Sequence, residues 1–311
     1  MKVIDFEQIR ALNISPAQYF RWVSEMIQKK EEAILPAKLS LKPADGVFYN
    51  IMPSLLPKEQ FAGVKVVTRY PARLPALDSE ILLYDMHSGL PCALLDGTYI
   101  TAVRTGAVAA HSVKLLANPD FQTVGFIGLG NTARAAMEML LMLYPNKQLT
   151  VKLLKYKNQH ELFAARFPSA QIQYVYCDTP QAVVENSDVI LSAVTVFEED
   201  ICNTECFKAG CLVVPIHTRG FTNCDLVFDK VYADDTAHVH GFKNFGKFRF
   251  FAEVADVVNG KAPGRERETE RILAYNIGLS IHDIYLAEKI YTAVTADREI
   301  DLKAPKEKFW Y

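Results

Sequence analysis

The pattern of apolar and polar positions changes partway along the chain. Near the start, residues 15–18 (SPAQ) have the form of a capping box with proline at the first helical position. They predict a helix from there to about Glu32, with Phe20, Val23 and Ile27 on one apolar stripe. We therefore expect an amphipathic helix near the start of the chain, packed against a core.

The next stretch, about residues 38–101, has the alternation expected of β-strands. Short apolar runs such as 64–67 (VKVV) and 81–84 (ILLY) are separated by Pro, Gly and Asp. His87-Ser88-Gly89 and Asp96-Gly97 have the composition of hairpin turns. A helix is expected to follow over about residues 104–116, before Asn118-Pro119.

From Thr123 onward the pattern becomes one of alternating strands and helices. Strands are expected at 124–127, 149–154, 189–193, 212–214 and 230–233, and helices at 131–143, 160–166, from Thr179-Pro180, and at 279–293. This succession is typical of an α/β fold with a Rossmann-type, doubly wound parallel sheet.

Composition narrows the class of protein. The chain has 311 residues, a length that suits two domains, and a formal net charge of −2, which gives no basic surface for nucleic acid or anionic lipid. The first residues lack the signal-peptide pattern and no apolar run is long enough to span a bilayer, so we expect a cytoplasmic protein with no membrane partner. Six cysteines occur without a CxxC pair or a neighbouring histidine, so no metal is expected.

Residues 128–133 (GLGNTA) stand between a predicted buried strand and a predicted helix, the context that a dinucleotide site requires. Gly128 permits the tight turn and Gly130 lets the backbone approach a pyrophosphate. Asn131 and Thr132 open the helix, whose free N–H groups and partial positive charge suit phosphates. The sequence therefore predicts a nicotinamide cofactor at this turn.

Two further segments are candidates for the same site. An NAD-preferring fold usually places Asp or Glu after its second strand, whereas this chain has Lys155 and Lys157 there. Lysines favour a 2′-phosphate, so NADP(H) is favoured over NAD(H); the alternative is that both are solvated surface charges. Ala193 and Thr195 end a later strand of the same sheet, where the carboxyl ends of strands line the ligand crevice.

Several stretches, in order, resemble the ornithine cyclodeaminase/mu-crystallin family. Residues 96–107 (DGTYITAVRTGA) are similar to its "DG..IT..RT.A" signature. Met52-Pro53 with 63–65 (GVK) are similar to its "MP…K" elements. Gly260-Lys261 with Gly264-Arg265 are similar to its "GK..GR" turn, and residues 278–283 to its "G…D" helix start. The resemblance covers nearly the whole chain.

The resemblance implies an architecture and a class of activity. It implies an N-terminal α/β substrate and dimerisation domain (1–118, completed by 285–311), a dinucleotide-binding Rossmann domain (119–284) and a homodimer. Its members move a hydride at the α-carbon of an amino or imino acid, so the expected partner is a small amino, imino or keto acid. Imine reductase or amino-acid dehydrogenase is the first interpretation. Ornithine cyclodeaminase and a non-catalytic, mu-crystallin-like ligand-binding protein are the alternatives.

The resemblance also assigns roles to single residues. Arg104 matches the arginine that holds the substrate carboxylate, and the physical warrant is a bidentate, planar clamp. Lys65 matches the active-site lysine; without the resemblance, a lysine between two valines is interpreted as a surface residue on an edge strand. If it is buried instead, desolvation suits it to proton exchange.

Weaker matches complete the set of candidates. Lys38 falls where relatives carry an arginine that touches the carboxylate, and Met52 belongs to the substrate element. Asn276 falls near a family serine beside the nicotinamide. Thr105, which follows the arginine, is expected at the cofactor.

The segment 214–220 (VPIHTRG) departs from the family pattern. Cyclodeaminases have G-A-D there, and Arg219 stands at the position of the aspartate that handles protons on the substrate amine. A cation at that position repels an alkylammonium group and suits a second carboxylate or a keto or imino oxygen. His217 is a candidate replacement for the missing proton carrier, because imidazole titrates near neutrality; the alternative is a structural histidine at a strand end.

Overall fold

The computed structural model describes residues 1–194, Phe197, 199–216, 220–295, 297–301, Pro305, Glu307, Lys308 and Trp310. These residues form two compact units, one made of 1–14, 32–100 and 283–311 and the other of 15–31 and 101–282. Among the described residues, no helix has both the length and the apolar character needed to cross a membrane.

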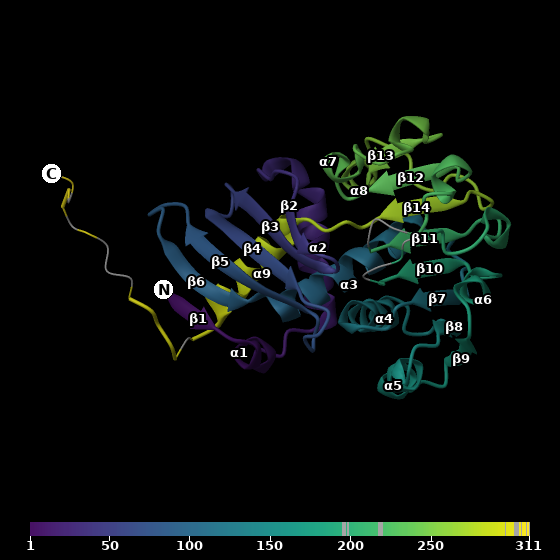
Figure 1. Cartoon of the computed structure of the whole chain (residues 1–311), viewed down its shortest axis with the longest axis horizontal. Coiled ribbons are helices and arrows are strands. Elements are labelled where there is room, and N and C mark those ends of the chain that lie inside the picture. The colour runs from purple at the N-terminus through teal and green to yellow at the C-terminus, as the bar shows by residue number, and fades with distance from the viewer. Residues whose placement is uncertain are drawn as a thin grey trace. The chain divides into compact units, whose positions relative to one another are not determined.

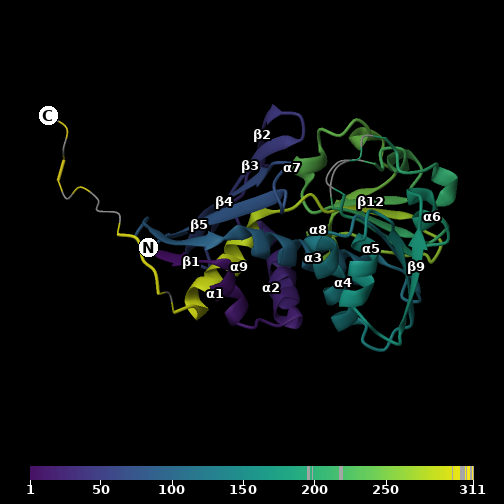
Figure 2. The same cartoon turned by 60° about the horizontal axis from the view of Figure 1, so that its bottom comes forward.

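The first unit is built on a six-stranded sheet with the order β1-β6-β5-β4-β3-β2. Its elements are β1 (Lys2–Ile4), α1 (Phe6–Ala11), β2 (Leu39–Ala44), β3 (Val47–Leu56), β4 (Phe61–Arg69), β5 (Leu77–Asp85), β6 (Pro91–Asp96) and most of α9 (Ser280–Ala293). In Figures 1 and 2, α9 lies along one face of this sheet. The contact is close, because a Cβ on Gly63 of β4 would meet Ile284 of α9 at 2.5 Å.

The two faces of this sheet differ in burial. Strands β3, β4, β5 and β6 pair antiparallel, so residues directly opposite one another share a face. The row that contains Lys65 faces α9 and is buried. The neighbouring row, which faces the other way, is apolar and partly exposed; it consists of Pro53, Val64, Leu82 and Leu94.

One predicted turn of this unit is wrong. His87-Ser88-Gly89 does lie in the turn between β5 and β6, but Asp96-Gly97 is not a hairpin turn. Asp96 ends β6, and its carboxylate accepts a hydrogen bond of 3.0 Å from the Tyr99 backbone N–H. Asp-Gly is here a helix start, since Asp is also a good cap residue. Helix α3 consequently runs over Gly97–Leu116, seven residues earlier than the predicted start.

The second unit is an α/β layer built on an eight-stranded parallel sheet. Its order is β13-β12-β14-β11-β10-β7-β8-β9. The strands are β7 (Thr123–Ile127), β8 (Leu149–Leu154), β9 (Ile172–Cys177), β10 (Val189–Ser192), β11 (Leu212–Pro215), β12 (Lys230–Ala233), β13 (Phe251–Glu253) and β14 (Ile272–Tyr275). The helices are α2 (Pro16–Gln28), most of α3, α4 (Asn131–Leu143), α5 (Gln159–Arg166), α6 (Pro180–Val184), α7 (Thr236–Val239) and α8 (Val254–Val258).

The doubly wound parallel sheet predicted from the sequence is confirmed, and so is the α/β class. The chain runs outward from β7 to β8 and β9 on one side, and then returns to β10 on the other side of β7. The topological switch point therefore lies between β7 and β10, where such sheets bind ligands at the carboxyl ends of the strands. Three strands, β9, β13 and β14, were not predicted, and α2 ends at Gln28 rather than near Glu32.

The boundary of the second unit differs from the predicted division at residue 118. Helix α3 packs so closely on α4 that a Cβ on Gly106 would meet the Ala135 backbone at 2.6 Å. This packing places 101–118 with the parallel sheet. The assignment of substrate binding and dimerisation to one part and cofactor binding to the other stays a prediction.

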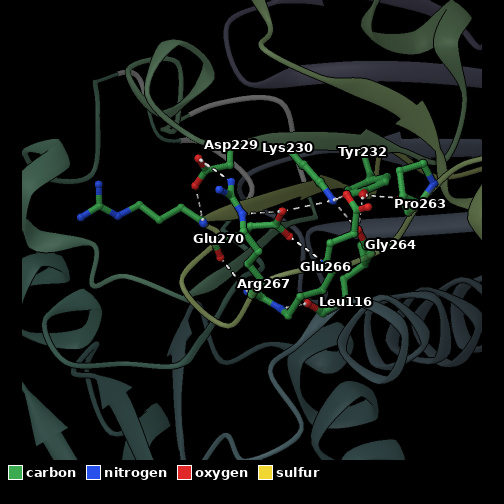
Figure 3. A network of polar contacts seen from close by, with 11 residues as sticks. Leu116, Asp229, Lys230, Tyr232, Pro263, Gly264, Glu266, Arg267 and Glu270 are labelled. Atoms are coloured by element: carbon green, nitrogen blue, oxygen red, sulfur yellow. Dashed lines mark hydrogen bonds and ion pairs between the residues drawn. The ribbon is translucent and has the colours of Figure 1, made fainter.

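A polar network holds the Gly264-Arg265 turn against this sheet (Figure 3). The Lys230 ammonium, at the start of β12, donates to the Gly264 carbonyl at 2.7 Å and pairs with Glu266 at 2.6 Å. Arg265 donates to the carbonyl of Leu116, the last residue of α3, at 2.9 Å. Because Lys230 stands at the amino end of its strand, this network lies at the edge of the sheet opposite the Gly128 turn. We therefore interpret it as an anchor for the end of α3.

Candidate functional site

The glycine turn after β7 has the geometry that the sequence predicts. Gly128 has a φ of +86°, and a Cβ there would lie 2.9 Å from the Ala193 carbonyl carbon. The Ala193 N–H in turn donates to the Ile127 carbonyl at 2.7 Å. Gly128 thus lets the ends of β7 and β10 come together at the switch point, because a side chain there would clash with Ala193.

The start of α4 fits a pyrophosphate. Gly130 is the N-cap residue, no side chain caps this helix, and a Cβ on Gly130 would meet nothing within 4 Å. Gly130 and Asn131 are exposed, and Thr132 is partly exposed. The N–H groups of the first turn therefore face open space with the helix dipole behind them, which is the arrangement that binds phosphates.

The segment after β8 contains the two predicted cations, and a third cation, Arg134, reaches it from α4. Lys155 forms an exposed ion pair of 2.9 Å with Asp178. Lys157 has a φ of +49° and its ammonium lies 5.4 Å from the centre of the Tyr156 ring. Arg134 of α4 reaches the same turn, where it donates to Gln159 at 3.2 Å.

Arg104 is buried in α3 and lies against the turn that follows β14. Its side chain packs on Gly278, where a Cβ would come within 2.9 Å of Nη1. Gly278 has a φ of +99°, and its N–H donates to Asp234 at 2.5 Å. Asp234 follows β12 and Gly278 follows β14, so Arg104 lies at the carboxyl edge of the same parallel sheet as Gly128.

Asn276 is placed at this edge by short polar contacts. The Asn276 amide donates to Ser112 Oγ of α3 at 3.1 Å, and its backbone N–H donates to the Pro215 carbonyl at the end of β11. Thr105 lies next to Arg104 in α3, and its hydroxyl donates to the Thr101 carbonyl at 2.6 Å. The parallel sheet therefore brings the predicted cofactor turn, Arg104 and Asn276 to one edge.

Lys65 lies in an internal strand and is completely buried. Its ammonium donates to Asp283 of α9 at 2.5 Å, and both side chains are 0% exposed. Met52 lies directly opposite in β3 and is also buried. The interpretation of Lys65 as an edge-strand surface residue is wrong, because β4 has a partner strand on each side and α9 covers the face to which Lys65 points.

The remaining predicted residues are less informative. Lys38 lies in the segment before β2 and is partly exposed. Thr195, His217 and Arg219 lie outside the described residues. No three His, Cys, Asp or Glu side chains gather as a metal site in the described parts of the chain.

Sequence reasoning assigned no role to two acids that the structure places beside the candidates. Asp283 lies in a recognised helix-start motif, but it is 218 positions from Lys65 and its pairing could not be inferred. Asp234 follows a strand that was predicted, yet nothing in the sequence links it to Gly278. Acids that end buried strands or begin buried helices are the signal that could have found both.

The fold and the residues at the carboxyl edge of the parallel sheet together define a class: an α/β protein with a Rossmann-type sheet, a glycine turn at its switch point and a buried arginine at the same edge. Residues 10–298 match the model of the ornithine cyclodeaminase/mu-crystallin family. The chain therefore belongs to this family, as the motifs predicted.

Relatives extend over most of the chain. The chain is similar to the nodulation efficiency protein NfeD of Rhizobium meliloti, 26% identical, with 82% of this chain and 83% of the relative covered. It is 27% identical to a Delta(1)-pyrroline-2-carboxylate reductase of Bacillus cereus, with 78% and 80% covered. A solved structure of the Thermococcus litoralis Delta(1)-pyrroline-2-carboxylate reductase, in complex with NADH and L-proline, superposes with a TM-score of 0.80 at 24% identity, covering 94% of this chain and 97% of the other.

Proposed function

We propose that this protein is an NAD(P)-dependent oxidoreductase that transfers a hydride at the α-carbon of an amino or imino acid. The observation that carries the proposal is the meeting of two features at one sheet edge: the Gly128 turn and the Arg104 guanidinium seated on Gly278. One feature suits a dinucleotide and the other a carboxylate. An imine reductase and an amino-acid dehydrogenase catalyse this hydride transfer in opposite directions.

Each residue has a physical task in this proposal. When bound, the nicotinamide supplies or accepts the hydride. The N–H groups at the start of α4 hold the pyrophosphate, and Arg104, with Lys38 as a second cation, holds the substrate carboxylate and so orients the α-carbon. Lys65 holds the proton that the substrate nitrogen or a water exchanges, and Asp283 keeps its ammonium in place.

Ornithine cyclodeaminase remains the second candidate, because it is the activity after which the family is named. Arg219 at the position of the family aspartate argues against it, since a cation there disfavours an alkylammonium side chain. Incubation with ornithine and catalytic NAD, followed by assay for proline and ammonia, separates cyclodeamination from net reduction.

The third candidate is a non-catalytic, mu-crystallin-like ligand-binding protein. A buried lysine paired with Asp283, at the family's catalytic position, argues for an enzyme. Tight NADPH binding without any turnover of imino or keto acids would support the binding protein instead.

We further propose a preference for NADP(H) over NAD(H). Lys155, Lys157 and Arg134 surround the turn after β8, and a 2′-phosphate next to a second strand is attracted by such cations. Asp178 offsets part of the Lys155 charge, so Lys157 and Arg134 carry more of the expected effect. The comparison of apparent affinities for NADPH and NADH tests this, and a clear NADH preference would contradict it.

We also propose a homodimer formed through the apolar row of β3 to β6 that faces away from α9. Its four members, Pro53, Val64, Leu82 and Leu94, are only partly buried within the unit. Leu82→Glu should convert the dimer to a monomer in light scattering, whereas Leu226→Glu on an exposed residue of the other unit should not. The predicted cytoplasmic location stays a prediction.

The experiment that tests the activity is a panel of cyclic imines and of keto acids with amines, followed by NADPH absorbance. Lys65→Ala should abolish turnover and leave NADPH binding intact. Lys58→Ala, in an exposed pair with Glu32 of the same unit, is the matched control and should keep full activity. Turnover that survives in the Lys65 variant would refute the role given to the lysine.

A further inference from the structure

A small cavity lies inside the second unit, close to the turn on which Arg104 packs, and its lining is mostly apolar with a few polar groups. Its volume is about 10 Å³, close to the space that one water molecule needs. Its lining includes apolar residues of α2, α3 and α8, together with polar ones at the ends of β12 and β14. The residues are Ile27, Lys30, Val108, Asp234, Val254, Ala255, Asn276, Leu279 and His282.

Asp234 supplies the reason to expect an occupant. Only 7% of this residue is exposed, and one carboxylate oxygen, Oδ2, accepts the Gly278 N–H. Among the described residues, the other oxygen, Oδ1, has no hydrogen-bond partner; His238 Nδ1 lies 3.9 Å from it. A buried carboxylate oxygen without a donor is costly, so native proteins usually supply one, often an ordered water.

Lys30 contributes a hydrogen-bond donor to the same lining, whereas Asp234 contributes an acceptor. Its ammonium pairs with Asp235 at 2.7 Å and with Glu253 at 2.5 Å, which uses two of its three N–H donors in the described contacts. A molecule in the cavity that accepts from Lys30 and donates to Asp234 satisfies both groups. Water does this. An ammonium or metal ion does not, because it has no acceptor for Lys30 and is repelled by its charge.

We propose that one water molecule occupies this cavity and bonds to Asp234 Oδ1, and that it thereby holds Asp234 where the carboxylate fixes Gly278 against Arg104. The water makes Asp234 a positioning residue for the substrate anchor. This second half rests on the role of Arg104 under the proposed function, whereas the presence of the water does not.

A crystal structure of the full chain, without added substrate and at a resolution that shows ordered solvent, tests the first half. The expected result is one density peak in the cavity within hydrogen-bond distance of Asp234 Oδ1, kept when crystals are grown without ammonium salts. A dry cavity would overturn the proposal, and so would a peak that appears only in ammonium salts. Neither result depends on turnover, so failure here is distinct from failure of the proposed activity.

Variants of α3 and of Asp234 test the second half. Val108→Ile adds one methylene to the cavity lining and should displace the water, raising the KM of the acid substrate by about tenfold with NADPH affinity unchanged. Val113→Ile is the matched control, buried in the same helix and outside the lining, and should leave KM within about twofold.

Asp234→Asn should behave almost as the unmodified chain, because the amide oxygen accepts from Gly278 and the amide nitrogen donates to the water. Asp234→Ala should raise KM as much as Val108→Ile or more. An unchanged KM in a Val108→Ile protein whose crystal structure lacks the water would refute the positioning role. If Val108→Ile does not fold, the KM of the two Asp234 variants decides, and equal values for them would refute it.

Discussion

The two units each bury one cation that the proposed function needs, yet they hold it in different ways. In the first unit, Lys65 is fixed by a side chain: the Asp283 carboxylate at 2.5 Å, with both groups 0% exposed. In the second unit, the Arg104 guanidinium packs on a glycine of φ +99° whose N–H is held by Asp234. The first arrangement is sensitive to charge and the second to an added methyl group.

The difference follows from what surrounds each cation. Lys65 lies between a sheet and the helix that covers it, where the low local dielectric makes an unpaired charge very costly. Arg104 lies at the carboxyl edge of a parallel sheet, where loops converge and glycines shape the space. Substitutions in the two units should therefore differ in the size of their effects, and removing the buried charge should cost the most.

Removing the acid of the buried pair should have the largest effect. Asp283→Ala leaves the Lys65 ammonium buried without its partner and should lower the free energy of unfolding by about 3–5 kcal/mol, measured by urea denaturation. Glu32→Ala, which breaks the exposed pair with Lys58, should cost less than about 1 kcal/mol.

A double variant separates stability from function. Lys65→Met combined with Asp283→Leu replaces the pair by apolar groups of similar volume, and should recover most of the lost stability without restoring turnover. Equal stability losses for Asp283→Ala and Glu32→Ala would show that the burial of the pair does not matter.

Adding a methyl group at Gly128 should have the next largest effect. Gly128→Ala puts a Cβ 2.9 Å from the Ala193 backbone at a φ of +86°, and should cost about 2 kcal/mol of stability and at least tenfold in NADPH affinity. Gly89→Ala has a similar φ of +72° but open space around it, and should change stability without changing NADPH affinity.

Gly130→Ala sharpens the same test. Nothing lies within 4 Å of its Cβ, so the unfolding midpoint should stay unchanged while titration shows weaker NADPH binding. A variant that binds NADPH normally would mean that the phosphates do not approach this backbone.

Substitution of Gly278, on which Arg104 packs, should have a smaller effect than substitution of Gly128. Gly278→Ala places a Cβ 2.9 Å from Nη1, and the end of a flexible side chain can move away. We expect a KM for the acid substrate about tenfold higher, with a smaller change in kcat. The control is Gly260→Ala, which has a φ of +70° and no neighbour within 4 Å, so its KM should be that of the unmodified protein.

The smallest effect is expected on the exposed cations. Lys157→Ala should weaken NADPH binding about threefold and leave NADH binding unchanged, because solvent and salt screen an exposed charge. Lys147→Ala, a surface lysine near Phe121, should change neither affinity. Equal losses for NADPH and NADH would place Lys157 away from the 2′-phosphate.

Local sequence signals were enough for features that depend on neighbouring residues. The GLGNTA turn, the Ser15 cap and the alternation of strands and helices after residue 123 were predicted because a turn, a cap and a period are set within a few positions. The same local reasoning failed at Asp96-Gly97, since a hairpin turn and a helix start use the same residue types. It also missed β9, β13 and β14, whose places in the sheet depend on pairing with other strands.

Local sequence patterns were sufficient for the family, the parallel sheet and the place of the Gly128 turn. The burial of Lys65 against Asp283, the packing of Arg104 on Gly278 and the cavity beside Asp234 are visible only in the folded chain. Burial and ion pairing bring together residues such as Lys65 and Asp283, which are 218 positions apart in the sequence. A local pattern covers only neighbouring positions and therefore cannot predict such contacts.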